Sequence, residues 1–303
     1  MGNKVKEGTK TSAFGVSKRE NHDSSIFYSS KMYEGLNGEK NVKYIENEID
    51  PDIINKIHCL DSRNISILPE NSIHLMVTSP PYNASKEYDE DLSLKEYLQL
   101  LKDVFQEVFR VLVPGGRACV NIANLGRKPY LPLSSYIIRD MIDIGFLMRG
   151  EVIWDKGTPG GSCAWGSWQS AANPTLRDGH EYILIFSKDK YNRPSKGKEN
   201  TISKEEFLDF TKSVWEFTPE SAKKIGHPAP FPIELPYRCI QLFTFKNDVV
   251  LDPFVGSGTT CVAAIKTGRR FIGIDIDEEY VKNAHKRIKK YQDQMKLSYF
   301  EKL

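Results

Sequence analysis

Short apolar segments alternate with helical patterns from Lys56 to Ile274, and this alternation is the feature that most constrains the fold. In the stretch from Ser93 to Leu112, apolar residues recur every three or four positions, as they do along one face of a helix. Strands separated by helices pair in parallel, because the crossing helix returns the chain to the same end of the sheet. The sequence therefore predicts an α/β fold with a mainly parallel sheet that is covered on both faces.

The same periodicity places the individual elements along the chain. Apolar runs predict strands at Lys56–Leu60, His74–Val77, Arg117–Ile122, Phe146–Trp154, Glu181–Phe186, Val249–Leu251 and Arg270–Ile274. Helical spacing predicts helices at Ser93–Leu112, Leu133–Ile144, Ile233–Phe243 and Thr259–Ile265. We expect Pro114-Gly115-Gly116 to end the first helix, because proline and glycine interrupt helices.

Composition divides the chain into a polar arm and one large domain. Residues 1–48 are rich in Lys, Glu, Ser, Asn and Gly, which is typical of a partly ordered arm. The folded domain is expected at residues 49–293, followed by a short tail at 294–303. A glycine-rich loop at 155–179 and a polar, basic insertion at 188–226 interrupt this domain. Long loops in compact domains are usually functional, so we expect these two segments to serve binding.

Cysteine usage and hydropathy exclude several classes of protein. The 5 cysteines are scattered, and no Cys-x-x-Cys pair occurs. This pattern is typical of a reduced, cytoplasmic protein, and it predicts neither a disulfide framework nor a metal site. No apolar run approaches the ~20 residues that a membrane-spanning helix needs, and the N-terminal residues are polar. We therefore expect a soluble protein without membrane association.

The segment that follows Val77 places unusual groups at the end of an apolar strand. It reads Thr-Ser-Pro-Pro-Tyr-Asn and contains Ser79-Pro80-Pro81-Tyr82. Two consecutive prolines fix two φ angles near −65° and remove two N–H donors, so the backbone presents carbonyl oxygens. Acceptors on a rigid frame suit an exocyclic NH2 group, and the ring of Tyr82 can stack on a planar base. The alternative interpretation is a Pro-Pro turn that only ends a buried strand.

A second signal lies downstream, where an apolar strand leads into a glycine turn and a helix. The turn Asp252-Pro253-Phe254-Val255-Gly256-Ser257-Gly258 precedes a helix that begins at Thr259. Glycines allow a ligand to approach the backbone closely, and a helix N-terminus leaves N–H groups unpaired. The next strand ends at Asp275, close to the ~20-residue interval at which a carboxylate meets ribose hydroxyls. Cys261 stands where the dinucleotide motif needs Gly or Ala, which disfavours NAD, and no Gly-Lys-Ser/Thr follows the glycines, which excludes a P-loop.

Together these two motifs resemble those of the DNA amino-methyltransferases that use S-adenosylmethionine. The chain is similar to the permuted group of this family, in which Ser-Pro-Pro-Tyr precedes Phe-x-Gly-x-Gly, and the resemblance covers roughly Lys56 to Tyr291. It implies a Rossmann-like methyltransferase fold, circularly permuted, with a seven-stranded, mainly parallel sheet that has an antiparallel last hairpin. It also implies S-adenosylmethionine as the cofactor and identifies residues 49–293 as the methyltransferase domain.

The resemblance assigns roles to particular residues. Asp275 would bind the ribose of the cofactor, and Asp61 would approach its adenine. The segment Gly226–Pro232 resembles the element that packs beside the cofactor. The implied catalytic residues are Ser79, Pro80, Pro81 and Tyr82, and the implied cofactor-binding residues are Asp61, Asp252, Phe254, Gly256, Gly258, Thr259 and Asp275.

Two segments are candidates for DNA contacts, although the net charge of +2 does not by itself indicate nucleic-acid binding. In the glycine-rich loop, Trp165 and Trp168 either stack beside an extruded base or pin the loop to the core. The insertion is where the family usually places target recognition, and its cations either contact phosphates or are solvated. These cations are Lys188, Lys190, Arg193, Lys196 and Lys198. The pair His180-Glu181 suggests acid–base chemistry, but a lone His at a strand start is more typical of a structural role.

Methylation of a base amine requires its lone pair to be localised, because in the free base the lone pair is delocalised into the ring. If Ser79 Oγ and the Pro80 carbonyl each accept one N–H bond, the lone pair is directed toward the methyl group. The base must be flipped out of the duplex, with Tyr82 stacking against it. No covalent intermediate with the protein is required.

Serine at the position of Ser79 favours cytosine N4 as the target, because relatives with Asp there generally methylate adenine N6. Adenine N6 stays open as the first alternative, since some relatives with Ser act on adenine. A second alternative is a protein that binds cofactor and DNA without turnover. The resemblance implies double-stranded DNA as the partner, and a restriction endonuclease that acts on the same site and need not be bound. Monomer and homodimer both stay open.

Overall fold

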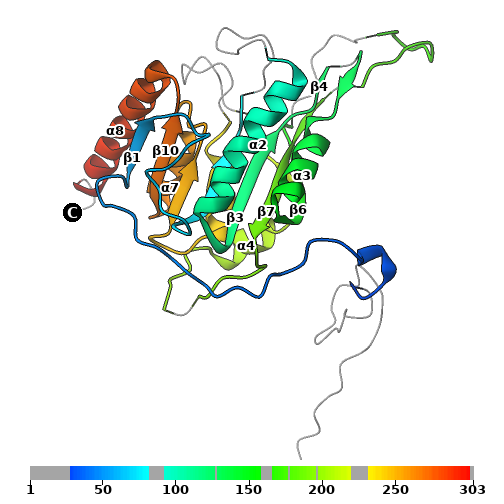
Figure 1. The fold of residues 1–303 in the computed structure, drawn as a ribbon. Coiled ribbons are helices and arrows are strands. Elements are labelled where there is room, and N and C mark those ends of the chain that lie inside the picture. The colour runs from blue at the N-terminus through cyan, green and yellow to red at the C-terminus, as the bar shows by residue number, and fades with distance from the viewer. Residues whose placement is uncertain are drawn as a thin grey trace, which may run out of the picture. The chain divides into compact units, whose positions relative to one another are not determined.

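A computed structural model of the chain describes residues 28–81, 92–126, 128–157, 166–176, 178–195, 197–219 and 231–300, with side chains as far as residue 295. The chain separates into two compact units, Met1–Gly38 and Glu39–Leu303. The described part of the first unit contains the short 3-10 helix η1 (Lys31–Tyr33). The second unit contains the strands and the other helices (Figure 1).

An eight-stranded sheet forms the centre of the second unit. Every strand except β7 points in the same direction, so the sheet is mainly parallel, as the sequence predicts. A separate two-stranded ribbon pairs β4 (Leu125–Gly126) with β5 (Tyr130–Leu131). In spatial order the strands of the large sheet are β1 (Lys56–Cys59), β10 (Arg270–Asp275), β9 (Val249–Asp252), β2 (Ile73–Thr78), β3 (Leu112–Ile122), β7 (His180–Lys188), β6 (Phe146–Asp155) and β8 (Val214–Glu216).

The sheet therefore has one strand more than the seven that the resemblance implies. The additional strand is β8, which lies at the edge and pairs in parallel with β6. It comprises 3 residues, of which the central Trp215 is buried. A strand this short gives no apolar alternation to detect, so the sequence predicts only a polar insertion here. The helix α4 (Lys204–Phe210) precedes β8 and begins with a capping box formed by Ser203 and Glu206.

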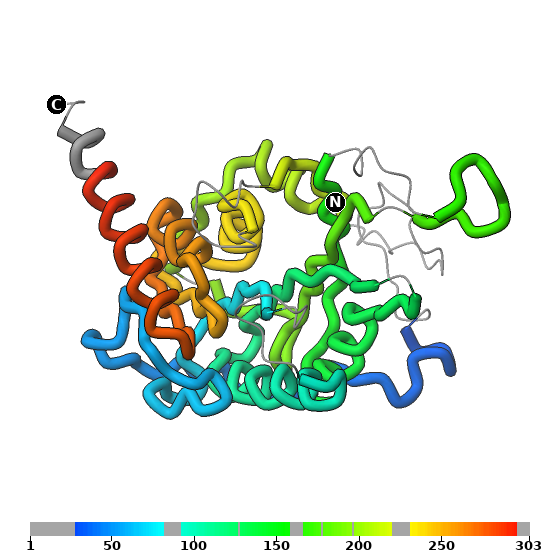
Figure 2. The backbone as a smooth tube through the Cα atoms, turned by 90° about the horizontal axis from the view of Figure 1, so that it is seen from above, coloured from blue at the N-terminus to red at the C-terminus, as the bar shows by residue number. Residues whose placement is uncertain are grey.

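Helices cover both faces of the sheet (Figure 2). On one face lie α2 (Leu94–Val111) and α3 (Leu133–Ile144), and on the other lie α6 (Glu234–Phe243), α7 (Thr259–Lys266) and α8 (Glu278–Phe300). Each face has its own cluster of buried apolar side chains, one from α2 and α3 and one from α6, α7 and α8. The sheet thus separates two cores, which is the layered arrangement expected for a parallel α/β domain.

The junction between α2 and β3 differs from the prediction. α2 begins after a capping box at Ser93 and ends at Val111, and β3 begins at the next residue. Pro114-Gly115-Gly116 therefore lies inside β3 and does not end the helix. Gly115 has a φ of +80°, and a side chain there would meet the carbonyl oxygen of Asn192 at 2.1 Å. Glycine is required at this position for close approach of two backbone segments.

Two other predicted boundaries also differ in the structure. Residues 39–48, which the sequence assigns to the arm, belong to the second unit, where the Asn47 N–H donates to the carbonyl of Asn71 at 2.8 Å. At the other end, α8 continues to Phe300, so most of the predicted tail at 294–303 is helical. Both segments are polar, and their hydropathy therefore gives no sign of this order.

The direction of the strand connections reverses between β9 and β2. From β2 the chain crosses through α2 to β3, whereas from β9 it crosses through α7 to β10 on the other side. The two crossing helices lie on opposite faces of the sheet. In open α/β sheets, ligands bind in the crevice outside the carboxyl ends of the strands at such a reversal. Since Ser79 follows β2 and Pro253 follows β9, the two predicted motifs meet at this crevice.

Candidate active site

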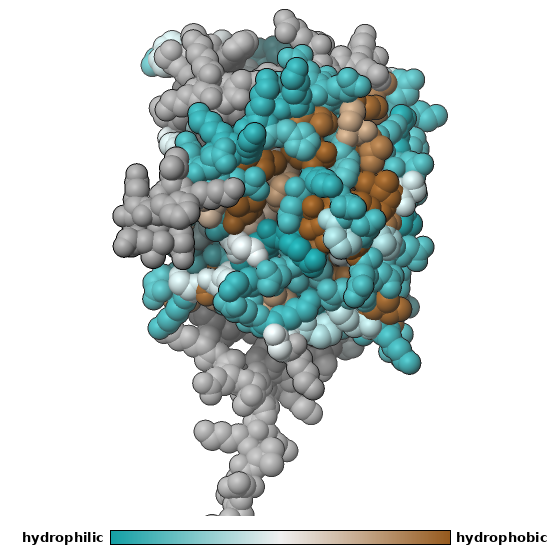
Figure 3. Space-filling view, turned by 90° about the vertical axis from the view of Figure 1, so that its left-hand side faces the viewer, coloured by the Kyte–Doolittle hydropathy of each residue, from teal (hydrophilic) through white to brown (hydrophobic). Residues whose placement is uncertain are grey.

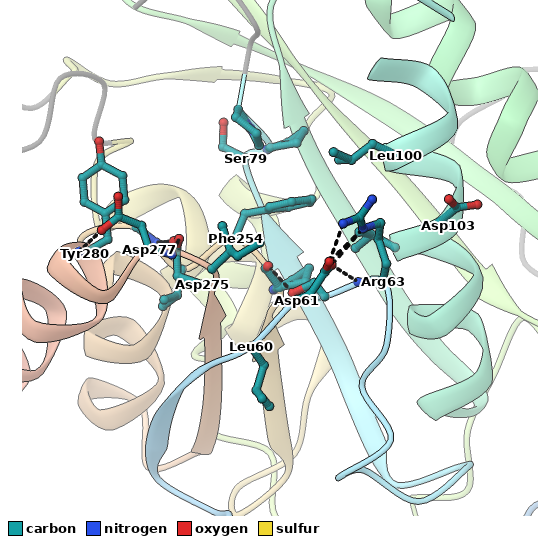
Figure 4. Close-up of a pocket in the computed structure, with 18 of the residues that line it drawn as sticks. Leu60, Asp61, Arg63, Ser79, Leu100, Asp103, Phe254, Asp275, Asp277 and Tyr280 are labelled. Carbon is teal, nitrogen blue, oxygen red and sulfur yellow. Dashed lines mark hydrogen bonds and ion pairs between the residues drawn. The ribbon is translucent and has the colours of Figure 1, made fainter. Parts of the chain in front are cut away.

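A cavity of about 580 Å³ lies at the reversal point (Figure 4). Its wall consists mainly of residues that follow β1, β2, β9 and β10, together with part of α2. The volume is typical of small-molecule sites, which span roughly 300–1,000 Å³. The wall contains these predicted site residues: Asp61, Ser79, Pro80, Pro81, Phe254, Gly256, Thr259 and Asp275. The catalytic and cofactor motifs thus share one cavity.

Acidic side chains dominate the charge of the cavity wall. Arg63 is the one cationic residue among the described wall residues, and its guanidinium binds both carboxylate oxygens of Asp61 at 2.5–3.0 Å. These hydrogen bonds from Arg63 lower the pKa of Asp61 below its ordinary value. The acidic wall residues are Asp61, Glu96, Asp103, Asp275 and Asp277. Such a wall favours a cationic ligand over a phosphate-bearing one.

The N–H groups of the glycine turn are bonded within the protein. The Gly256 N–H donates to Asp275 Oδ2 at 2.9 Å, and the Gly258 N–H donates to the Val255 carbonyl at 2.8 Å. The sequence predicts unpaired N–H groups at the N-terminus of the following helix, and the N–H groups of these two glycines are not among them. The turn is therefore unlike the phosphate-binding loops, whose N–H groups point at the anion. An acidic wall and a turn of this kind fit S-adenosylmethionine, whose sulfonium and ammonium groups are positive.

Two predicted cofactor residues support the turn without lining the cavity. Gly258 has a φ of +79°, and a side chain there would approach Ala284 Cβ of α8 at 3.3 Å. Asp252 is fully buried at the end of β9. Neither residue belongs to the wall. Asp252 belongs to the buried end of β9 before the turn, and Gly258 faces α8, so neither is directed into the cavity.

The segment after β2 is fixed from α2. The hydroxyl of Tyr97 donates to the carbonyl of Pro81 at 2.7 Å, and Ser79, Pro80 and Pro81 all line the cavity. Tyr82, the predicted stacking residue, lies outside the described residues. The segment Gly226–Pro230 is also outside them, while the next residue, Phe231, lies in the wall.

Three polar residues beside Ser79 form a row that the sequence does not reveal. Asn121 Nδ2 donates to Glu181 Oε2 at 2.6 Å and lies 3.4 Å from Ser79 Oγ. Lys156 Nζ lies 2.5 Å from the other carboxylate oxygen of Glu181. Asn121 is 1% exposed, and its Oδ1 has no hydrogen-bond partner among the described residues. A buried amide with an unpaired oxygen is uncommon, and it marks this row as part of the site.

The order of the strands explains why these residues meet. Asn121 is near the end of β3, Glu181 is near the start of β7, and Lys156 directly follows β6, and these three strands are neighbours in the sheet. Because Thr78 pairs with Val120 in the parallel register, the residue after each lies at the same level. The only available signal is a polar residue at each strand end, which becomes informative once the strand order is known. His180 packs edge-on against a neighbouring tyrosine, with ring centroids 5.0 Å apart, in accord with a structural role.

The first basic residue of the insertion, Lys188, lies at the edge of the sheet that is formed by the amino ends of the parallel strands. The cavity and Ser79 lie at the opposite edge, which is formed by their carboxyl ends. β7 is antiparallel to β3, so Lys188 at its end lies beside the amino ends of the parallel strands, away from Ser79. Its Nζ donates to Asn71 Oδ1 and to the carbonyls of Arg110 and Leu112 at 2.7–3.1 Å. Burial lowers the pKa of Lys188 to about 8. The prediction that Lys188 contacts DNA is therefore wrong.

Arg193 is also a structural residue. Its side chain is 6% exposed and forms an ion pair with Asp248, which is itself buried. Lys198 pairs with Asp248 and with Glu46 at the same edge. The prediction that Arg193 contacts DNA is wrong, because its guanidinium is buried and neutralised by Asp248 inside the protein. The sequence gives no sign of this, because the acidic partners are distant along the chain.

The remaining DNA candidates are Trp168 and Lys190, since Trp165 and Lys196 lie outside the described residues. Trp168 is 69% exposed, so it does not pin the loop to the core. Lys190 is half-buried and follows β7 at the edge of the sheet opposite Ser79, so we expect it not to contact DNA that is bound at the cavity.

Three further observations concern the surface, the metal donors and the helices of the described part of the chain. On the face shown in Figure 3, hydrophilic side chains predominate and separate patches of hydrophobic ones. Among the described residues, no three His, Cys, Asp or Glu side chains are placed to hold a metal ion. No helix in that part of the chain has the length and hydropathy needed to cross a membrane.

Comparisons with known proteins agree with this site. The family model for DNA methylases of the N6/N4 type matches residues 73–286. The type II methyltransferase M.MjaI of Methanocaldococcus jannaschii is 35% identical over 275 residues, which cover 76% of this chain and 89% of that protein. TTHA0409, a putative DNA modification methylase from Thermus thermophilus solved in complex with S-adenosyl-L-methionine, superposes with a TM-score of 0.63 at 32% identity, covering 78% of this chain and 93% of that one.

The fold comparison extends to a more distant structure. The PvuII DNA methyltransferase, described as cytosine-N4-specific, has a TM-score of 0.61 at 23% identity and covers 78% of this chain and 89% of its own. At this identity the likeness establishes the α/β fold with its mostly parallel sheet. The match of the family model and the similarity to M.MjaI go further, and they show that the chain belongs to the N6/N4 DNA methylase family.

Proposed function

We propose that this chain is a site-specific DNA methyltransferase that transfers a methyl group from S-adenosylmethionine to the exocyclic N4 amine of cytosine in duplex DNA. The observation that carries the proposal is that Ser79 and the residues of the cofactor turn open onto the same cavity. A methyl donor held by the turn and an amine held at Ser79 would be adjacent.

The cavity residues suit the cofactor in charge and in donor type. When bound, S-adenosylmethionine supplies an electrophilic methyl group on a positively charged sulfur. Asp275 is the last residue of β10, where its carboxylate can accept hydrogen bonds from ribose hydroxyls. Asp61 lies in the segment after β1, where its carboxylate can accept a hydrogen bond from the adenine amine. The five carboxylates of the wall stabilise the cation by long-range attraction.

The residues around Ser79 prepare it to accept a hydrogen bond from the amine. Asn121 Nδ2 faces both Glu181 and Ser79 Oγ, so the amide group presents its donor side to the serine. Ser79 Oγ keeps a second lone pair that can accept one N–H of the base, and the Pro80 carbonyl is the proposed acceptor for the other. The rigid Pro-Pro frame and the bond from Tyr97 to Pro81 hold these acceptors where charge develops.

Cytosine is the proposed base because Ser79 occupies the first position of its motif. The chain is further proposed to belong to the permuted group of the family and to be the modification enzyme of a restriction–modification system. The relative M.MjaI, named a type II methyltransferase, supports that role. Trp168, which is largely exposed, is proposed to contact DNA near the flipped base.

Identification of the methylated nucleoside tests the proposal. Purified protein would be incubated with mixed-sequence duplex DNA and deuterated S-adenosylmethionine. The DNA would then be digested to nucleosides, which would be separated and identified by mass spectrometry. We expect deuterated N4-methyldeoxycytidine, with none in reactions that lack the protein. Detection of deuterated N6-methyldeoxyadenosine would instead identify adenine N6 as the target of methylation. Calorimetric binding of the cofactor without any methylated nucleoside would favour a protein that binds without turnover.

A further inference from the structure

Asp252 joins the two halves of the active site. It is the last residue of β9, it lies next to β2 in the sheet, and it is 0% exposed. Its Oδ1 accepts a hydrogen bond from the Thr78 hydroxyl at 2.6 Å and another from the Phe254 N–H at 3.2 Å. Thr78 precedes the catalytic Ser79, and Phe254 lines the cofactor cavity. One carboxylate oxygen thus connects the catalytic strand to the cofactor turn.

The second oxygen of Asp252 is buried and has no hydrogen-bond partner among the described residues. The hydroxyl of Thr260 is near the carboxylate, but it donates to the Val77 carbonyl at 3.3 Å. A buried carboxylate with one unpaired oxygen is costly in its charged form. Accordingly, burial raises the pKa of Asp252 to about 6, so both protonation states are accessible near neutral pH.

Within the described part of the chain, no cation compensates this charge. No Lys or Arg there forms an ion pair with Asp252, and the charged or titratable groups that face it are acidic or neutral. Asp275 of β10 acts against the ionised form of Asp252, and the buried thiol of Cys261 in α7 faces the same carboxylate. The charge of Arg287 in α8 acts on Cys261, and the Arg287 guanidinium donates to Ser257 and Thr259 and not to Asp252. The described side chains therefore supply no positive charge at this place.

We propose that Asp252 is a buried counter-charge that favours the cationic methyl donor over the neutral thioether product and that releases its proton when the donor binds. The inference rests on the proposed function, which supplies the cofactor. Asp252 does not line the cavity, but it is bonded to Thr78 and to the cavity residue Phe254, so it would act on a bound cation through the protein. In a medium of low dielectric constant, such a cation stabilises the ionised carboxylate without direct contact. By linkage, ionised Asp252 strengthens donor binding by the same factor. The product S-adenosylhomocysteine has lost the sulfonium charge and shares its ammonium and carboxylate groups with the donor, so ionisation of Asp252 favours the donor.

Calorimetric titration with the two ligands tests this inference without any methyl transfer. The wild-type protein would be titrated with S-adenosylmethionine and with S-adenosylhomocysteine between pH 5 and pH 7.5, in buffers of different ionisation enthalpy. We expect the affinity ratio of donor to product to rise on the order of tenfold as the pH increases, which corresponds to one pKa unit of linkage. Donor binding near pH 6 should release a fraction of a proton, and product binding should release none.

The isosteric variant Asp252→Asn separates Asp252 from the other carboxylates of the site, which it leaves in place. We expect the pH dependence of the affinity ratio to disappear in this variant. If the ratio still rises with pH, the effect belongs to Asp275 or Asp61 and the inference is overturned. A ratio that is independent of pH in the wild type overturns it as well. Failure to bind the donor at every pH would overturn both this inference and the proposed function.

A second variant keeps the inference testable if Asp252→Asn does not fold. Thr78→Val removes the hydroxyl that stabilises the ionised carboxylate, whereas Thr78→Ser retains it. We expect the rise in the affinity ratio to move to higher pH in the Val variant and to stay in place in the Ser variant. An unchanged midpoint in Thr78→Val would contradict the proposed role, since Thr78 is fully buried and does not line the cavity.

Discussion

The edge of the sheet formed by the amino ends of the parallel strands and the edge formed by their carboxyl ends each contain a buried carboxylate. Asp248 at the first is ion-paired, whereas Asp252 at the second forms no ion pair among the described residues. At the amino ends of the parallel strands, Arg193 pairs with Asp248, and His74 lies 2.8 Å from Glu46 and 3.4 Å from Asp248. At the carboxyl ends, where the cavity lies, the buried Asp252 has an oxygen without any partner among the described residues. The difference teaches that buried charge alone does not mark a functional site. A buried carboxylate that lacks a counter-charge beside a cavity is the stronger indication.

The largest expected effect concerns stability at the paired edge. Asp248→Ala leaves Arg193 buried without its partner, and breaking a buried ion pair in this way costs about 3–5 kcal/mol. Urea unfolding should show this loss, while kcat of the folded variant at low temperature should stay near the wild-type value. Glu199→Ala is the control, because its ion pair with Lys246 is exposed and worth about 1 kcal/mol or less. A large fall in kcat with unchanged stability would contradict the comparison.

The second prediction concerns the pH dependence of stability at the unpaired edge. Burial raises the pKa of Asp252 from 3.8 to about 6, so between these pH values the folded state holds a proton that the unfolded state has released. The free energy of unfolding therefore falls as the pH rises through this window, by roughly 3 kcal/mol for Asp252 alone. Urea unfolding would give the free energy of unfolding of the wild type and of Asp252→Asn at pH 4 and at pH 7. The contribution of Asp252 is the change, between the two pH values, in the difference between the two proteins. A difference independent of pH would contradict it.

The third prediction concerns the row beside Ser79. In Glu181→Gln the carboxylate that orients Asn121 becomes an amide, and the pairing with Lys156 loses its charge. We expect kcat to fall by roughly tenfold, equivalent to about 1.4 kcal/mol, with an unchanged dissociation constant for the cofactor. Glu151→Gln, an exposed position of β6, is the matched control and should behave as the wild type. If the two substitutions changed kcat equally, the row of Asn121, Glu181 and Lys156 would have no specific role in methyl transfer.

The smallest expected effect concerns DNA binding at the paired edge. Each phosphate contact contributes about 0.9 to the slope of log K against log salt concentration. Because Lys190 lies at the edge away from Ser79, Lys190→Gln should leave both the DNA affinity and this slope unchanged. Fluorescence anisotropy over a range of salt concentrations would measure both quantities. A slope reduced by about 0.9 would mean that DNA reaches the opposite edge.

Most of the fold was predictable because its elements are long and periodic. The helix Leu133–Ile144 has the predicted limits, since a proline precedes it and Gly145, at a φ of +113°, ends it. Two features of the sheet were not predictable from local pattern. The edge strand β8 is too short to show alternation, and Pro114-Gly115-Gly116 is needed for a close backbone approach to Asn192 that no local signal announces.

The candidate site was predictable where its residues are contiguous in sequence. Ser79 and the turn around Gly256 occur in compact motifs, and both line the cavity. Asn121 and Lys156 belong to no motif and join the site only because β3, β7 and β6 are neighbours. Lys188 shows the converse, since it lies in a basic segment but binds three acceptors that are distant in sequence. Such roles depend on tertiary contacts, which hydropathy and spacing do not encode.

The most direct test of the central claim is the rate of methyl transfer by Ser79→Ala. Single-turnover reactions with labelled cofactor and duplex DNA would be compared for this variant, the wild type and Ser135→Ala, an exposed serine of α3. Loss of one preorganised hydrogen-bonding group lowers rates on the order of 10²–10³. We expect a fall of this size for Ser79→Ala, with nearly constant cofactor affinity and N4-methylcytosine as the residual product. Transfer at the wild-type rate would mean that Ser79 is only a turn residue, and the account would be wrong.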